Sequence, residues 1–561
     1  MLITDDQLKT LLLNAKITDE GTLQSVLDFA NSTSISFEEA IVEKDIISDE
    51  NLGILIADFL KKPFIVLSKL TILENVFTSI PEKFARKHKV VPFQRDATGI
   101  KVAMANPMDK EVTDMIWRKT GQQVLPHLAT ERDIYNTLSI YRKDLQKTFN
   151  AIMEGHLVNK ELQTFANVPI AKIVDLVINY AYQDKASDIH IEPQEKESLI
   201  RFRIDGILHD VLLIPKALHD QLITRLKVIS RLRTDEHLAP QDGKLRVHLV
   251  EEDLDIRLSI LPIVEGEKAV MRLLASRFRL FSLLDLGMSD TDLKKVSKAV
   301  ARSYGMILST GPTGSGKTTS IYAILKILNS RAKNITTIED PVEYRIKGVN
   351  QIQVNPKTNL TFANGLRSIL RQDPNIVFVG EIRDNETAGI AVNAALTGHL
   401  VVSTLHTNDA ATALPRLIDM DVEPFLVAST VNIIIAQRLM RKICEMCKVS
   451  IVVTKEELVK NLPEAAIKKH FTMSGPIQIY EGKGCKICHG TGYKGRVGAF
   501  EVLEVTKEIR KLITDREDAD VVAQKAIEEG MMTMLDDGLQ KVVKGVTTIE
   551  EVLRVTKVES I

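Results

Sequence analysis

The chain has 561 residues, enough for about three or four domains. Its 73 lysines and arginines almost balance its 74 aspartates and glutamates, so no net field favours nucleic acid or an anionic membrane. Hydrophobic residues make up 44%, as in packed globular proteins, but no run of about 18 apolar residues could span a bilayer. The acidic start, residues 1–6, lacks the segments of a signal peptide. We therefore expect a cytoplasmic protein that reaches a membrane only peripherally, through partners.

The N-terminal quarter of the chain is predicted to form a module of its own, residues 1–145. Residues 17–20, Ile-Thr-Asp-Glu, and residues 47–50, Ile-Ser-Asp-Glu, each resemble a helix N-cap followed by an acidic first turn. They are either two similar helix starts or a duplicated unit. After residue 63 a strand and a helix are expected, and the polar residues 146–165 are assigned to a linker.

A small α+β sheet domain is predicted over residues 166–287. It begins with a helix over 170–183, and Asp205-Gly206 later supplies a hairpin turn. Alternation of polar and apolar residues predicts half-buried strands at 186–193, 199–204, 245–249 and 254–260.

Residues 311–318, Gly-Pro-Thr-Gly-Ser-Gly-Lys-Thr, form a complete phosphate-binding loop between a predicted strand and a predicted helix. Its glycines let backbone N–H groups turn toward a phosphate, and the helix N-terminus adds positive dipole. Lys317 can reach the β- and γ-phosphates, and the Thr318 hydroxyl can ligate Mg²⁺. The sequence therefore predicts an ATP and magnesium site. Its nucleotide contacts are Gly311, Pro312, Thr313, Gly314, Ser315, Gly316, Lys317, Thr318 and Thr319.

Three further apolar strands, at 334–338, 376–379 and 400–405, each run into polar residues. The carboxyl ends of parallel strands share the edge where open α/β sheets bind ligands. Hydrolysis needs a base, a metal site and a sensor of the γ-phosphate. The residues that fit these roles, in that order, are Glu343, Glu381 and His406.

A single carboxylate at such a strand end could equally be a helix cap or a surface acid. Glu381 also stands where many nucleotide hydrolases have a metal-holding aspartate, so Mg²⁺ would depend on Thr318 and on water held by Glu381. The whole segment 288–561 is assigned to a P-loop ATPase domain with a mostly parallel sheet and a helical C-terminus.

All four cysteines lie in two C-x-x-C pairs, Cys444 with Cys447 and Cys485 with Cys488. A tetrahedral Zn²⁺ takes four thiolates, and each pair can supply two from one turn. The residues between the pairs would then loop out as an excursion. Two redox pairs or a disulfide are the alternatives, and we expect structural zinc.

Four motifs in order resemble the secretion ATPase superfamily. They are GPTGSGKT at 311–318, IEDPVEY at 338–344, VGEIRD at 379–384 and TGHLVVSTLHTNDA at 397–410, similar to its Walker A, Asp box, Walker B and His box. The resemblance spans roughly residues 165–561. Within the superfamily the chain looks like the type IV pilus assembly ATPases, with the type II secretion ATPases as the alternative.

That resemblance implies a multidomain α/β fold: a helical and α+β N-terminal module, a PAS-like sheet domain, and a RecA-like ATPase domain with a zinc-binding insertion. It implies a homohexamer that hydrolyses ATP to polymerise pilin through an inner-membrane platform protein. In the alternative, the same motor builds a pseudopilus and drives protein export. Glu343, Glu381 and His406 take the catalytic positions, and Arg257 and Arg272 take those of arginine fingers.

Some family members bind cyclic di-GMP at an Arg-Leu-Gly signature in the N-terminal module. Here the aligned residues are Asp6-Gln7-Leu8, and Ala15 stands where a glycine is expected. We therefore expect docking to the platform protein rather than cyclic di-GMP binding. Two other classes stay open: a nucleic-acid motor, which the missing basic stripe disfavours, and a scaffold that binds nucleotide without turnover, which Lys317, Glu343 and Glu381 disfavour.

Overall fold

The structure is a computed structural model. It describes residues 3–33, 35–44, 46–70, 72–96, 98–138, 145–154, 168–249, 252–274, 282–471 and 477–556. The chain divides into two compact units, one of residues 1–64 with 279–561 and one of residues 65–278. The predicted boundaries at 145, 165 and 287 stay predictions. Of the predicted linker, residues 146–154 belong to helix α9 (Leu145–Glu154), and 155–165 lie outside the described residues.

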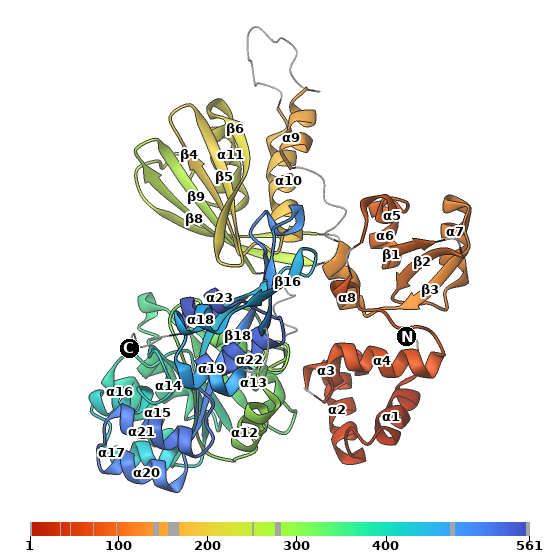
Figure 1. The fold of residues 1–561 in the computed structure, drawn as a ribbon. Coiled ribbons are helices and arrows are strands. Elements are labelled where there is room, and N and C mark those ends of the chain that lie inside the picture. Colours follow the sequence, from red (N-terminus) through yellow and green to blue (C-terminus); the bar gives the residue numbers. More distant parts are fainter. Residues whose placement is uncertain are drawn as a thin grey trace. The chain divides into compact units, whose positions relative to one another are not determined.

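The first unit begins with four short helices, shown in red in Figure 1. They are α1 (Asp5–Asn14), α2 (Glu20–Thr33), α3 (Phe37–Glu43) and α4 (Asp49–Leu60). Before α4 the predicted Ser48 cap is confirmed, since its hydroxyl accepts from the Asn51 N–H at 3.3 Å; before α2 the capping residue is Asp19 instead of Thr18, and its carboxylate accepts from the Thr22 N–H at 2.9 Å. Such caps satisfy N–H groups that have no partner within the helix.

The remainder of this unit is built on a seven-stranded sheet in the order β12-β11-β13-β14-β10-β15-β18. Its strands are β10 (Gly305–Thr310), β11 (Ile335–Glu339), β12 (Asn350–Gln353), β13 (Ile376–Val379), β14 (Leu400–Leu405), β15 (Val431–Ile443) and β18 (Tyr493–Glu504). Neighbouring strands run parallel, except that β15 and β18 are antiparallel. The predicted, mostly parallel sheet is confirmed.

Helices cover both faces of this sheet, because successive strand residues point to opposite sides. In β10, Met306 and Leu308 pack into one core, and Ile307 packs into the other. Helices α14 (Phe362–Ile369), α15 (Asn385–Leu396), α16 (Ala413–Asp419) and α17 (Pro424–Thr430) contribute to the first core. Helices α12 (Asp290–Val300) and α13 (Lys317–Leu328) contribute to the second.

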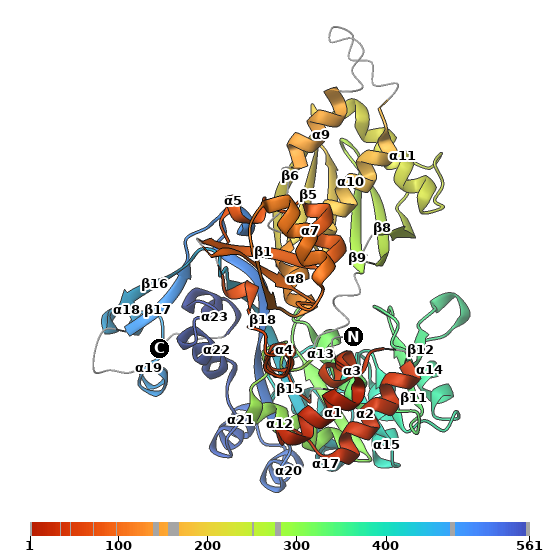
Figure 2. The same ribbon diagram turned by 90° about the vertical axis from the view of Figure 1, so that its right-hand side faces the viewer.

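The residues between β15 and β18 form the predicted excursion. They hold an antiparallel pair, β16 (Lys448–Val453) with β17 (Ile477–Gly482), and the short elements α18 (Lys455–Val459), α19 (Glu464–His470) and η6 (Lys486–Cys488). Figure 2 shows this pair as a blue ribbon separate from the large sheet. After β18 the chain is helical as expected, with α20 (Lys507–Thr514), α21 (Ala519–Glu528), α22 (Met534–Val543) and α23 (Ile549–Val555).

The second unit opens with a three-stranded sheet, β1-β2-β3. The elements here are η1 (Leu67–Lys69), α5 (Glu74–Phe77), α6 (Glu82–His88), β1 (Val90–Asp96), β2 (Gly99–Met104), α7 (Lys110–Thr120), β3 (Val124–Leu128) and α8 (Glu131–Thr137). Strand β2 pairs antiparallel with β1 and parallel with β3, and one hydrophobic core lies beneath them.

A six-stranded antiparallel sheet, in the order β6-β5-β4-β9-β8-β7, completes the second unit. Its elements are α10 (Ile170–Gln183), β4 (Asp188–Pro193), β5 (Glu197–Ile204), β6 (Ile207–Pro215), η3 (Lys216–Leu218), α11 (His219–Ile229), β7 (Gln241–His248), β8 (Asp253–Ile263) and β9 (Gly266–Leu274). Helices α9, α10 and α11 pack on the apolar face of this sheet.

Candidate active site

The phosphate loop joins the carboxyl end of β10 to the first turn of α13. Gly311, Gly314 and Gly316 all have positive φ, at 143°, 79° and 90°. A Cβ on Gly311 would lie 2.5 Å from the carbonyl oxygen of Gln437 and 2.6 Å from the Ser315 hydroxyl. Since both approaches are shorter than any real Cβ contact, this position requires glycine.

Lys317 is the first residue of α13, and its side chain is buried. Its ammonium donates to the carbonyl oxygens of Gly311 at 2.7 Å and Pro312 at 3.1 Å, so it is held against the phosphate loop. Burial lowers the pKa of Lys317, and the charge of Glu381 opposes that shift. The carboxylate of Glu381 therefore acts electrostatically on the Lys317 ammonium.

Glu381 and His406 are brought together at the ends of the neighbouring strands β13 and β14. Nε2 of His406 lies 3.1 Å from Oε2 of Glu381, and the Arg383 guanidinium lies 2.8 Å from the other carboxylate oxygen. The Glu381 side chain is 13% exposed, whereas that of His406 is 42% exposed. The imidazole is thus accessible to a ligand while its partner is mostly shielded from water.

Hydrogen bonds between strand ends fix the segment around this pair. The Thr404 hydroxyl donates to the Gly380 carbonyl at 2.7 Å, and the Ser403 hydroxyl donates to the Val379 carbonyl at 2.8 Å. A cavity of about 370 Å³ lies next to the Glu381 and His406 pair. It is lined by Ile382, Arg383, His406, Arg416 and Met420.

Glu343 lies in the loop that follows β11, the strand next to β13. Its backbone N–H donates to the Tyr322 hydroxyl on α13 at 3.4 Å. The sheet order therefore places all three predicted residues, Glu343, Glu381 and His406, beyond the carboxyl ends of adjacent strands.

Arg257 and Arg272 lie in the other compact unit. They are directly opposite each other on β8 and β9, so both point to one face of the six-stranded sheet. Arg272 is 61% exposed and pairs with Asp188, Nε to Oδ1 at 3.0 Å. The two arginines therefore lie next to each other on the six-stranded sheet.

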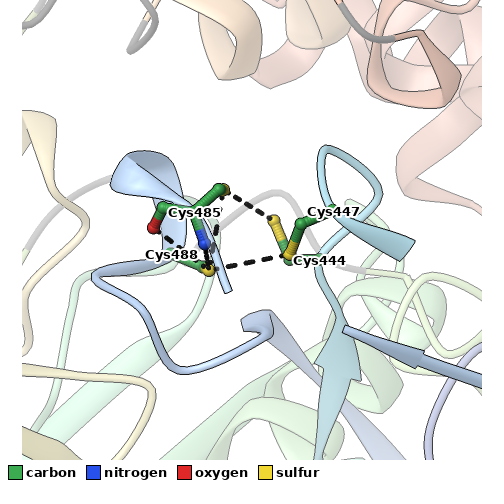
Figure 3. A group of neighbouring side chains, drawn as sticks. All are labelled: Cys444, Cys447, Cys485 and Cys488. Carbon is green, nitrogen blue, oxygen red and sulfur yellow. Dashed lines mark hydrogen bonds between the residues drawn. The ribbon is translucent and has the colours of Figure 1, made fainter. Parts of the chain in front are cut away.

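The four cysteines converge from the two ends of the excursion (Figure 3). Their sulfur atoms all lie within 4.8 Å of one another, with Cys444 to Cys485 and Cys447 to Cys488 both at 3.9 Å. Zn–S bonds of about 2.3 Å imply tetrahedron edges of about 3.8 Å. The Cys488 sulfur also accepts from the N–H groups of Cys485 at 3.1 Å and Gly492 at 3.3 Å, as a metal-bound thiolate would. The donor set therefore fits zinc.

Comparison with known proteins identifies the family. The model for "Type II/IV secretion system protein" matches residues 163–554, and the MshEN domain model matches residues 60–146. The chain is 36% identical over 567 residues to the type IV pilus assembly ATPase PilB of Myxococcus xanthus, a match covering 98% of each chain. The chain belongs to the type II/IV secretion system protein family.

Other similarities agree with this family. The type II secretion system protein E of Pseudomonas aeruginosa is 45% identical over 393 residues, which is 70% of this chain and 76% of the relative. The X-ray structure of the Legionella pneumophila ATPase DotB has a TM-score of 0.50 at 20% identity, covering 68% of this chain and 95% of that one; it shows the fold alone. Membership confirms the predicted class, a secretion-motor ATPase. Among the described residues, none of the helices has the length and hydrophobicity that crossing a bilayer requires.

Two residues that were not predicted from the sequence, Gln437 and Glu501, hydrogen-bond to segments of the candidate site. The Gln437 side chain on β15 donates to the Ser315 carbonyl of the phosphate loop at 2.8 Å. The Glu501 carboxylate on β18 accepts from the Ala410 N–H at 2.9 Å, just after the His box turn. The signal for both is a polar side chain directly after a short apolar run, residues 433–436 before Gln437 and residues 497–500 before Glu501.

Proposed function

We propose that the chain is the ATP-hydrolysing motor of type IV pilus assembly. The observation that carries this proposal is the similarity to the pilus assembly ATPase of Myxococcus xanthus over 98% of both chains. That match covers nearly the whole chain, whereas the match with the type II secretion protein covers 70% of it. The 45% identity of the latter keeps type II secretion as the second candidate.

In this proposal each residue of the strand edge has one task in hydrolysis. Lys317 offsets the charge of the β- and γ-phosphates. Thr318 and Thr319 extend the phosphate-binding loop into the first turn of α13. Glu343 accepts a proton from the attacking water. His406 hydrogen-bonds the γ-phosphate, and its contact with Glu381 supports its orientation. Thr318 and water on Glu381 would hold Mg²⁺, which would offset phosphate charge.

Arg257 and Arg272 are proposed to act as arginine fingers from the sheet domain. A guanidinium next to the γ-phosphate offsets the charge that develops there in the transition state. Fingers of this kind act across a domain or subunit boundary, so the proposal includes a homohexamer. Movement between the two units during each cycle would then drive the inner-membrane platform protein at which pilin is inserted.

Structural zinc is proposed at Cys444, Cys447, Cys485 and Cys488. Their sulfur spacing matches a tetrahedral thiolate site, and the ion would tie together both ends of the excursion. The N-terminal module is proposed to dock on the platform protein. The MshEN model matches residues 60–146. The departures from the Arg-Leu-Gly signature, at Asp6 and Ala15, lie before that segment, and because of them the proposal does not include cyclic di-GMP binding.

A genetic experiment separates the two candidate functions. The gene is deleted, and the strain is complemented with the wild type, with Glu381→Gln, or with the control Glu386→Gln, which changes an exposed acid that pairs with Arg367 on the surface. We expect surface pili to disappear and to return with the wild type and the control only. Loss of secreted enzymes with intact pili would instead establish the type II secretion motor.

A further inference from the structure

A buried carboxylate lies directly beside the loop that carries Glu343. Glu339 ends β11 and is 3% exposed. Its Oε1 accepts hydrogen bonds from the Thr337 hydroxyl at 2.5 Å and the Gln351 amide at 3.2 Å, and its Oε2 accepts from the Tyr322 hydroxyl. Burial raises the pKa of Glu339, and these three donors oppose that shift.

Two of those donors also hold the loop that follows β11. The Tyr322 hydroxyl accepts from the Glu343 N–H at 3.4 Å, and its ring packs edge-on against Tyr344 at 4.6 Å between centroids. The Gln351 side chain accepts from the Ile346 N–H at 2.7 Å and donates to the Tyr344 carbonyl at 3.1 Å. The backbone of the loop is therefore held at Glu343, Tyr344 and Ile346.

The three side chains come from separate elements and meet only in the fold. Tyr322 lies on α13, the helix that starts at Lys317, Glu339 ends β11, and Gln351 lies on β12. A buried carboxylate is costly unless its oxygens are satisfied, so an apolar residue would serve better if this site were only core. The carboxylate instead orients two side chains that both bind the same loop.

We propose that Tyr322, Glu339 and Gln351 are positioning residues that fix the Glu343 loop relative to the helix of the phosphate loop. This inference rests on the proposed role of Glu343 as the base that accepts a proton from water. A base works only when it is held within hydrogen-bond reach of that water, and a displacement of about 1 Å can lower the rate on the order of 100-fold. None of the three residues touches the reacting atoms.

The test uses Tyr322→Phe, which removes one hydroxyl and keeps the ring, and Gln351→Leu, which removes both loop bonds of that side chain. We expect each to lower kcat about tenfold or more. KM and the affinity for a non-hydrolysable ATP analogue should stay within about twofold, because Lys317 and the phosphate loop are untouched. Thr337→Val is the matched control, since Thr337 bonds Glu339 but not the loop, and it should keep nearly full turnover.

Each variant is then combined with Glu343→Gln in the full-length protein. With the base already removed, Tyr322→Phe should cause no further fall in kcat. An equal fall in both backgrounds, or unchanged kcat in folded Tyr322→Phe and Gln351→Leu, would overturn the inference while leaving the motor function intact. Full turnover of Glu343→Gln alone would overturn the role of Glu343, and this inference with it.

Discussion

Nε2 of His406 and Oε2 of Glu381 lie 3.1 Å apart, although the two residues belong to different motifs and different strands. The contact depends on the parallel register of β13 and β14, in which Val379 is opposite Ser403. Both residues therefore lie beyond the carboxyl ends of these neighbouring parallel strands. The Glu381 and His406 side chains, which follow two different strands, thus meet in one direct contact.

The proposed roles of Glu381 and His406 couple the two residues, so their contributions to turnover should not be independent. We expect His406→Gln and Glu381→Gln each to lower kcat by about 100-fold, and the double variant to be little worse than either alone. Steady-state ATP hydrolysis measures this. His248→Gln is the control, since the His248 side chain is exposed in the other unit and pairs with Asp253. Multiplicative losses would show that the contact has no functional coupling.

The arginines should be required for turnover rather than for folding. We expect Arg272→Ala to lower kcat on the order of 1,000-fold, while Arg203→Ala changes it little, although both arginines pair with Asp188. If the finger acts between subunits, mixing Arg272→Ala with Lys317→Ala protein should restore part of the activity, because each supplies what the other lacks. A mixture as inactive as its components would contradict action between subunits.

The cysteine cluster predicts bound metal and local order. We expect elemental analysis of the purified chain to find one zinc per subunit, and Cys488→Ser to lose it. Without the ion, limited proteolysis between β16 and β17 should become faster, because the metal–thiolate bonds that join the two cysteine pairs are lost and only backbone hydrogen bonds remain there. Met446→Leu, which changes a residue between Cys444 and Cys447, is the control. Four unreactive thiols in a metal-free protein would indicate disulfides instead.

Glu501 should make stability depend on pH. Burial raises the pKa of this carboxyl from 4.5 to about 7, against the hydrogen bond from the Ala410 N–H. The folded state therefore binds its proton more tightly than the unfolded state does. Its contribution to stability is fully present below pH 4.5 and is lost as pH rises through about 7, a difference of about 3 kcal/mol.

The variant Glu501→Gln keeps the acceptor oxygen and removes the charge. Compared with the wild type, it should melt at a higher temperature at pH 8 and at a similar temperature near pH 4.5, as followed by scanning calorimetry. Glu504→Gln, on the same strand but partly exposed and paired with Lys298, should melt like the wild type at both pH values. A Glu501→Gln difference that does not change with pH would contradict the raised pKa.

Local patterns were sufficient to predict the nucleotide-binding strands and the phosphate loop. Strands β13 and β14 have their expected bounds and β11 lies within one residue of them, because each combines an apolar run with an abrupt polar or glycine end. The contact between Glu381 and His406 depends on how β13 pairs with β14, which no local sequence pattern specifies. Pairing these two parallel strands with their carboxyl ends level is nevertheless the simplest arrangement.

Other elements were missed because their patterns are mixed. Strand β6 exposes apolar residues such as Ile207 and Leu213, and β9 places charged residues before its apolar ones. The Tyr322, Glu339 and Gln351 group could not be read from the sequence, since it depends on how α13 packs and on the pairing of β11 with β12.

Strand order also has a consequence for how the chain is made. Strand β10 pairs with β14 and β15. Strand β15 pairs in turn with β18, which ends at Glu504. A ribosome therefore releases the Walker A segment long before the strand that carries Gln437 and the one that carries Glu501 have emerged. A nascent chain cannot form the complete nucleotide cradle, so ATP is expected to be captured only by nearly finished subunits.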